Sequence, residues 1–296
     1  MLFNSVEFIT LVLTTLVLFY SPILKNKQVE VLIASSLIFY AWHYWELTFL
    51  LVASVLFNMS VTQLLLETRF KQKVIASFGV VGNLSILAIF KYAGLIGVTI
   101  FPNTDFASWL VLIPLPIGIS FYTFQGISMV VDVFRGNKNV LKVVETHSKK
   151  NIFLYISFFP QLIAGPIVKA HDFLPQISQK YFKDINFEIV FHYLVLGYFF
   201  KMVVADNLKD FTFWMEFPYF QSRSSLTLLT YLIAYSAQIF ADIEGYSLIT
   251  IGIALLFSYQ LPQNFNFPYI AKSFSDFWRR WHISLSSFLK SICTFP

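Results

Sequence analysis

The chain of 296 residues has a single cysteine, Cys293, and few charged side chains. One cysteine excludes an intrachain disulfide and a cysteine-only metal site. Charged residues make up 12% of the sequence and hydrophobic residues 57%, and the mean hydropathy is +0.67. A soluble core cannot hide that much apolar surface, so the composition predicts a membrane protein whose apolar runs cross the bilayer.

Common signatures of cofactor chemistry are also absent. The sequence has no P-loop, Gly-x-Ser-x-Gly, zinc-ligand or Rossmann pattern, so we expect no bound cofactor and no metal. The formal net charge of +5 does not indicate nucleic acid as a partner, because Lys and Arg gather in short loops between apolar runs. The expected partner of this surface is the lipid bilayer.

The apolar runs predict an all-α, polytopic membrane protein. We expect about eight to ten spanning or re-entrant helices plus one interfacial amphipathic helix, in a single membrane-embedded domain over residues 1–296. The first run shows no cleavage site and is interpreted as a retained span, not a signal peptide. The candidate runs are residues 8–20, 29–45, 47–66, 74–90, 109–133, 187–205, 226–241 and 246–259.

The loop charges predict the orientation. Lys25 and Lys27 follow the first run, whereas only Glu46 separates the second run from the third. Positive loops stay in the cytoplasm, so the N-terminus and Glu46 should lie outside it, and the basic loop that contains Lys138 should lie inside.

Two apolar runs are interrupted by proline and glycine, at residues 114–118 and 160–166. Paired prolines cannot continue a regular helix, so the first run should have a non-helical entry and a span from about Ile117. The second interruption has two interpretations, a kinked helix without a role or a re-entrant element that lines a substrate path.

Charged groups in the later runs have structural explanations. Residues 242–245 are expected to form a polar break between two runs, in which Asp242 and Glu244 face water, a cation or a cavity and point in different directions. Lys201 is expected to snorkel to the interface, and His192 to pair with Glu188 one turn before it.

Residues 273–288 are the most unusual stretch. They predict a helix with Ser273 as N-cap and Asp276 three residues later. Wound as one helix, this stretch has an aromatic face opposite a basic face, which is typical of a helix in a membrane interface. The apolar face comprises Phe274, Phe277, Trp278, Trp281, Leu285 and Phe288, and the other face comprises Asp276, Arg279, Arg280, Ser286 and Lys290. His282 lies at the seam, where a lone histidine more often borders lipid headgroups than catalyses.

Several motifs resemble one family closely. WRRWHISLS at residues 278–286, preceded by NFxxPYI, resembles a signature of the membrane-bound O-acyltransferases, in particular the branch that acetylates alginate and related bacterial polysaccharides. LPIGISFYTFQGIS with VDVFRG, FFPQLIAGPIVK and GYFFKMVVADN are similar to the same family. FxDxxGYS at residues 240–247 is similar too, but the family usually has a small or polar residue in place of Glu244 and an acid in place of Leu248.

The resemblance implies an enzyme of the cell inner membrane that moves an acyl group from a donor to a polysaccharide hydroxyl. A partner would supply the donor, and further periplasmic or membrane acetylation partners are expected. His282 would be a supporting catalytic residue, and Arg279 and Arg280 would hold an anionic sugar or donor phosphate. Trp278 and Trp281 would also be substrate-binding residues.

The resemblance also implies a second histidine, in a GLWHG motif, as the catalytic base. These 296 residues do not contain that motif, so we expect an incomplete and inactive chain. Two alternatives stay open: a non-catalytic membrane scaffold or passage, and D-alanyl transfer to teichoic acid.

Overall fold

The computed structural model describes residues 1, 3–42, 44–68, 71–112, 114–145 and 149–293. Over these residues every regular element is helical and no strand forms, which confirms the predicted all-α class. The α-helices are α1 (Val6–Tyr20), α2 (Gln28–Ala41), α3 (Trp45–Glu67), α4 (Gln72–Ile100), α5 (Asp105–Leu112), α6 (Ile119–Phe134), α7 (Lys138–Glu145), α8 (Lys149–Ser157), α9 (Ala170–Phe173), α10 (Phe187–Tyr198), α11 (Asp206–Thr212), α12 (Ser225–Leu256), α13 (Phe274–Arg280) and α14 (Ile283–Cys293).

Four helical stretches are long and apolar enough to cross a bilayer: α3, α4, the run Phe187–Met215 that contains α10 and α11, and α12. A fifth forms if α1 and α2 are counted together, since the chain bends by 92° between them, where a short 3₁₀ turn begins at Pro22. Proline favours the first position of such a turn and ends the preceding helix. Two shorter apolar helices are α6 and the stretch Ile283–Ile292 of α14.

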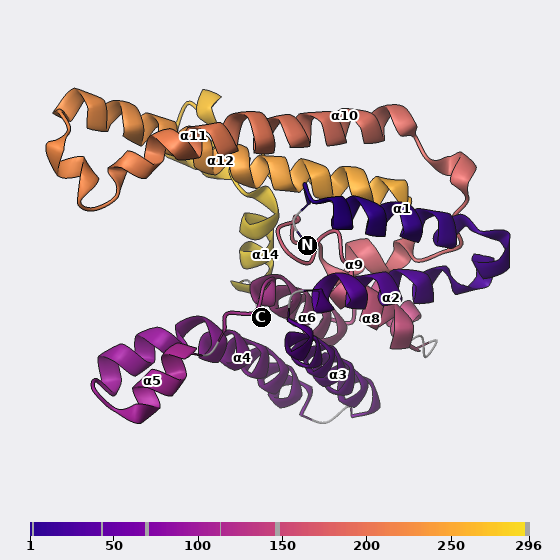
Figure 1. Cartoon of the computed structure of the whole chain (residues 1–296). Coiled ribbons are helices and arrows are strands. Elements are labelled where there is room, and N and C mark those ends of the chain that lie inside the picture. Colours follow the sequence, from indigo (N-terminus) through magenta and orange to yellow (C-terminus); the bar gives the residue numbers. More distant parts are fainter. Residues whose placement is uncertain (2, 43, 69–70, 113, 146–148, 294–296) are drawn as a thin grey trace.

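The helices form stacked layers (Figure 1). Along one edge α10 and α11 lie beside α12, and along the opposite edge α3 and α4 both pack on α6. Between these edges α1 packs on α2, which packs on α8. The helices α10 and α12 cross closely: a Cβ atom added to Gly197 would lie 3.0 Å from the Gly245 carbonyl oxygen. Glycine is therefore required at this crossing.

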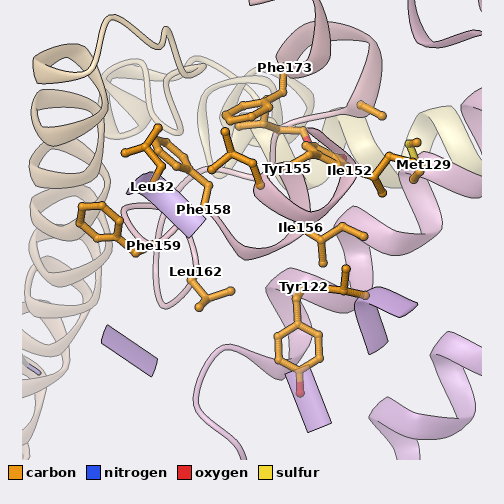
Figure 2. Close-up of a cluster of buried hydrophobic side chains, with 14 of the residues drawn as sticks. Leu32, Tyr122, Met129, Ile152, Tyr155, Ile156, Phe158, Phe159, Leu162 and Phe173 are labelled. Atoms are coloured by element: carbon orange, nitrogen blue, oxygen red, sulfur yellow. The ribbon is translucent and has the colours of Figure 1, made fainter. Parts of the chain in front are cut away.

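The two segments interrupted by proline and glycine are non-helical and meet each other. Gly118 has a φ of +77°, and a Cβ there would collide with the Leu162 carbonyl oxygen. The helix α6 begins directly afterwards, at Ile119, so the predicted non-helical entry is confirmed. In the second segment Phe158, Phe159 and Leu162 are fully buried in the hydrophobic core (Figure 2).

The non-helical backbone of residues 158–169 is supported by neighbouring elements. The Thr250 hydroxyl of α12 donates a hydrogen bond to the Pro160 carbonyl oxygen at 3.0 Å, and the side-chain amide of Gln161 donates to the Tyr155 carbonyl oxygen of α8 at 3.0 Å. Irregular backbone at membrane depth requires such protein partners. This favours an element with a fixed shape over an incidental kink, and its role in a substrate path stays a prediction.

The prediction of a polar break at residues 242–245 is wrong. The helix α12 runs without interruption from Ser225 to Leu256 and joins the two predicted runs. The carboxylates do not break the helix, because neither side chain points into lipid. Asp242 pairs with Lys201, and Glu244 faces a cavity. The single turn of polar residues is tolerated because its side chains reach a cation or a hollow, not lipid.

The prediction of one continuous amphipathic helix over residues 273–288 is also wrong. Its start is confirmed, since the Ser273 hydroxyl accepts a hydrogen bond from the Asp276 amide at 3.1 Å. However, α13 ends at Arg280 and α14 begins at Ile283, with His282 between them in a left-handed conformation (φ 43°). The aromatic residues therefore do not share one face: Trp278 is 57% exposed, whereas Phe288 is buried against α6.

Candidate functional site

The break between α13 and α14 is held by the extended segment 264–267. The Ile283 amide donates to the Asn264 carbonyl oxygen at 2.8 Å, and the Asn266 amide donates to the Arg280 carbonyl oxygen at 3.0 Å. These bonds satisfy backbone groups that two helix ends leave free. The left-handed conformation of His282, which costs an ordinary residue about 1–2 kcal/mol, is thereby fixed by its neighbours on both sides.

A buried polar network fixes the same segment to three other elements. The side-chain Nδ2 atom of Asn264 donates to the Ser247 hydroxyl of α12 at 2.8 Å, and its side-chain Oδ1 atom accepts from the Ser284 hydroxyl of α14 at 2.5 Å. Ser284 in turn accepts from the Ile167 amide at 3.0 Å. All three polar side chains are buried. A fully satisfied buried network specifies one arrangement, so the position of His282 is well defined.

His282 is the one motif histidine that the sequence singles out, and its ring is largely enclosed. Its Nδ1 atom is buried and has no hydrogen-bond partner within the described residues. Burial lowers the pKa of His282, so the ring is neutral at pH 7. Its ring lies 6.3 Å from that of Phe265. A neutral imidazole can donate a hydrogen bond through one ring nitrogen and accept one through the other.

The other predicted binding residues lie around this break in different environments. Arg280 donates to Asp276 at 2.9 Å and to the Asn266 carbonyl oxygen at 3.2 Å, so its guanidinium has protein partners. Arg279 and Trp278 are exposed on α13. Trp281 packs on Phe265 with ring centroids 5.0 Å apart. The structure thus brings Trp281 and His282 to the same wall and leaves Arg279 and Trp278 on the outer surface.

A cavity of about 850 Å³ adjoins that wall. We call it the α10–α12 cavity, because α10 and α12 form its sides and the segment 263–267 closes one end. Its lining combines amide, acid and aromatic side chains. The lining residues are Asn186, Glu188, Ile189, His192, Tyr193, Leu196, Phe200, Phe240, Glu244, Leu248, Gln263, Phe265, Asn266 and Phe267.

Phe265 connects the cavity with the helix break. Its ring lines the cavity on one side and contacts the rings of Trp281 and His282 on the other. Glu188 and His192 both line the cavity, but no hydrogen bond joins them in the described part of the chain, contrary to the predicted pair. Glu244 faces the cavity too, and Asp242, two residues before it, points elsewhere, as predicted.

Lys201 has a structural role, but it does not snorkel. It lies in a π-helical segment, Phe199–Ala205, and its Nζ atom contacts Asp206 at 2.8 Å and Asp242 at 2.7 Å. Only 16% of its side chain is exposed. A cation inside a helix pair is stabilised by such partners, and here they tie α12 to the end of the α10 run.

A pair of His171 and Asp132, which the sequence analysis did not single out, lies at the C-terminal end of α6. The His171 Nδ1 atom lies 2.8 Å from Asp132, which also accepts the His171 backbone amide at 3.1 Å. The hydrogen bond that the His171 ring donates to the Asp132 carboxylate raises the pKa of His171. The two residues are 39 positions apart, and only the fold brings them together.

No candidate metal site forms among the residues that the structure describes. In the described ranges no three His, Cys, Asp or Glu side chains gather in a way that could hold a metal ion. The absence of a resident metal or cofactor stays a prediction.

Comparisons with known proteins agree with the motifs at the helix break. The model of the membrane-bound O-acyltransferase family matches residues 8–291. The chain therefore belongs to the membrane-bound O-acyltransferase family and is a multi-pass membrane protein.

Several curated relatives match nearly the whole chain. It is 34% identical over 307 aligned residues to a "Probable alginate O-acetylase AlgI" of Pseudomonas aeruginosa, covering 98% of this chain and 56% of that protein. It is 32% identical over 295 to a "Peptidoglycan O-acetyltransferase" of Helicobacter pylori, covering 90% and 55%. A "Teichoic acid D-alanyltransferase" of Bacillus subtilis is 30% identical over 173, covering 57% and 42%. The chain spans little more than half the length of the P. aeruginosa and H. pylori proteins.

Proposed function

We propose that this chain forms the membrane-embedded part of an O-acyltransferase that acetylates hydroxyls of a cell-surface or exported polysaccharide. The observation that carries the proposal is the helix break at His282, a neutral ring fixed near the α10–α12 cavity in a chain of this family. The names of the relatives, alginate and peptidoglycan acetylases, support acetyl transfer to a sugar hydroxyl.

The chemistry is attack of the acceptor hydroxyl oxygen on the acyl carbonyl of a thioester or ester donor. The new ester bond forms as the bond to the donor's leaving group breaks, and the hydroxyl proton passes to a base. A positioned base contributes about 10²- to 10⁴-fold in rate. We assign His282 a supporting role, in which its neutral ring orients the acceptor or donor by one hydrogen bond. Trp278, Trp281, Arg279 and Arg280 are proposed to bind the donor or acceptor near the membrane surface.

A chimera tests the proposal. The part of the P. aeruginosa relative that follows the matched region is joined after Ser287, and the chimera is expressed in a strain that lacks its own acetylase. We expect ester-linked acetyl groups on the exported polysaccharide, and a decrease of about tenfold or more in His282→Ala. The unextended chain is assayed beside it, with the prediction that it is inactive.

His282→Asn is the matched control for backbone strain. Asparagine adopts the left-handed conformation readily, so this variant keeps the helix break but removes the imidazole. If the ring matters, both variants lose acetylation at normal expression. Full activity in both would remove His282 from the mechanism, and an inactive chimera beside an active relative would favour a non-catalytic scaffold.

The proposed location is the inner membrane, with the N-terminus and Glu46 outside the cytoplasm and Lys138 inside. The positive loops carry this orientation. Single cysteines at residues 46 and 138, in a Cys293→Ser background, test it. An impermeant thiol reagent added to intact cells should label residue 46 only, and labelling of residue 138 alone would invert the topology.

D-alanyl transfer to teichoic acid is a second candidate, favoured by the similarity to the B. subtilis enzyme over 57% of this chain. The same chimera separates the two activities. Incorporation of D-alanine and not acetate into the cell envelope would support this candidate over polysaccharide acetylation.

A further inference from the structure

We infer that four lysines at one end of the molecule form a binding site for the phosphate group of an anionic membrane lipid. We call them the α1–α2 lysine cluster: Lys25 and Lys27 lie in the turn between α1 and α2, and Lys180 and Lys183 lie in the segment between α9 and α10. The two segments meet at the same end of the helices, at the right in Figure 1. The inference concerns the lipid around the protein and does not depend on the proposed acyl transfer.

Two members of the cluster approach the same aromatic ring. The Nζ atom of Lys25 lies 5.3 Å from the centroid of the Tyr181 ring, and the Nζ atom of Lys183 lies 5.8 Å from it. A cation–π contact at an exposed site is weak and uses only part of the three N–H donors of an ammonium group. The two like charges repel each other, so an anionic oxygen that contacts both is favourable.

Lys180 extends the cluster towards the protein core. Its Nζ atom lies 5.1 Å from the centroid of the ring of Tyr259, which is a buried residue. Burial lowers the pKa of the Lys180 ammonium, because water solvates its charge less well, and the nearby Asp184 carboxylate opposes this effect. A poorly hydrated cation gains from an anionic partner, so a phosphate oxygen would replace solvation that Lys180 has lost.

The buried side chain of Gln28 fixes the two segments against each other. Its Nε2 atom donates to the Phe19 carbonyl oxygen at 3.1 Å and to the Lys180 carbonyl oxygen at 2.9 Å, and its Oε1 atom accepts from the Lys180 backbone amide at 2.9 Å. The side-chain amide of Gln179 also donates to the Lys25 carbonyl oxygen, at 3.4 Å. A site whose backbone is already held in place loses less conformational freedom when it binds a ligand.

The positive charge of the cluster is not neutralised by the protein. Within the part of the chain that the structure describes, none of the four lysines forms an ion pair with a carboxylate. Glu30 lies near Lys27 but is paired with Lys150 at 2.8 Å. Asp184 balances at most one of the four charges. The cluster therefore keeps a net positive charge that attracts an anion.

Exposed apolar side chains beside the cluster favour a lipid over a free phosphate ion. Ile23 is 91% exposed two positions before Lys25, and Phe182 is 53% exposed directly before Lys183. The Phe182 ring also packs on that of Phe187, the first residue of α10, with centroids 5.5 Å apart. At the ends of membrane-spanning helices, lysines reach lipid phosphates while neighbouring apolar side chains contact the acyl chains.

Lipid binding to the full 296-residue chain in a neutral detergent tests the inference, with native mass spectrometry as the measurement. The probes are phosphatidylglycerol and phosphatidylcholine with identical acyl chains. Phosphatidylcholine carries a cation of its own, so we expect phosphatidylglycerol to bind at least about tenfold more tightly. Lys25→Gln combined with Lys183→Gln should reduce this preference by about fivefold or more, and Lys180→Gln alone by about fivefold.

The matched control is Lys73→Gln combined with Lys209→Gln, which removes the same charge from exposed positions on α4 and α11. It should leave the preference unchanged, and all variants should keep the thermal unfolding temperature of the unmodified chain. Equal binding of the two lipids by the unmodified chain, or an equal loss of preference in the control, would overturn the cluster as a lipid site.

A second pair of measurements distinguishes a lipid from a free phosphate. Ile23→Ser removes an exposed apolar side chain without disturbing the core and should weaken the binding of both lipids. Soluble glycerol phosphate in large molar excess should not displace phosphatidylglycerol. Displacement, together with unchanged lipid binding by Ile23→Ser, would show a site for free phosphate and would overturn the inference.

Discussion

Replacing Lys201 by methionine should destabilise the packing of α12 on the α10 run. The change keeps an unbranched side chain of similar length and removes the cation between Asp206 and Asp242. At 2.7 and 2.8 Å, each pair has a Coulomb attraction of about 6 kcal/mol at an effective dielectric constant of 20. Desolvation of the charges cancels much of it, and breaking a fully buried pair costs about 3–5 kcal/mol.

Solvent reduces that figure here. The side chains of Asp206 and Asp242 are 41% and 42% exposed, so screening lowers the expected loss for Lys201→Met to about 2 kcal/mol in the free energy of unfolding. The assay is reversible denaturant unfolding in detergent micelles. Lys209→Met, at an exposed position on α11, is the control and should change stability by less than about 0.5 kcal/mol.

The double variant Lys201→Met with Asp242→Asn decides the mechanism. Without the lysine, Asp242 is an uncompensated charge, so removing that charge should cost less than it does in the unmodified chain. We expect a coupling energy of about 1 kcal/mol or more between the two positions. Strict additivity, or wild-type stability of Lys201→Met, would refute the idea that this cation holds the helices together.

Two further predictions concern other contacts. His171→Gln should lower the free energy of unfolding by about 1 kcal/mol near pH 6, because it removes the ion pair with Asp132 that raises the pKa of His171. Such a pair stabilises the fold fully below the unfolded pKa and loses its effect as pH rises through the folded pKa, so the difference between the two proteins should vanish by about pH 9 in thermal unfolding; a constant difference would contradict the ion pair. Gly118→Ala should lower the free energy of unfolding by about 2 kcal/mol or more, because the added Cβ atom would collide with the Leu162 carbonyl oxygen. Gly136→Ala, at a φ of +69° with no atom nearby, should lower it by about 1 kcal/mol. Equal losses would show that backbone strain alone acts.

Much of this fold could be predicted from local sequence. The hydropathy of the runs gave the all-α class, and the pairing of Ser273 with Asp276 gave the start of α13. The proline and glycine of residues 114–118 gave the non-helical entry to α6. These features are local, because each depends on the steric or hydrogen-bonding properties of residues adjacent in the chain.

The wrong predictions have one physical cause: partners distant in the sequence determine the structure at these positions. Asp242 was expected in a break of the helix, but Lys201, 41 positions away, is its counter-ion within a continuous helix. The local sequence favours a regular helix through His282, but the backbone amide of Ile283 donates to the backbone carbonyl oxygen of Asn264 and not to a carbonyl of the preceding turn. Asn264, beside Phe265, was the available signal, since a buried amide requires partners that the local sequence does not provide.

The hydrogen bond between Ile167 and Ser284 has a consequence for the order of assembly. It joins positions 117 apart, and the network that it completes needs the non-helical segment 158–169, α12 and α14 at once. A chain inserted from its N-terminus cannot form this network until its last described helix is in place, because contacts between distant positions come late in folding. The imidazole of His282 is thus oriented only after the surrounding membrane core exists, so an unfinished chain presents no assembled site.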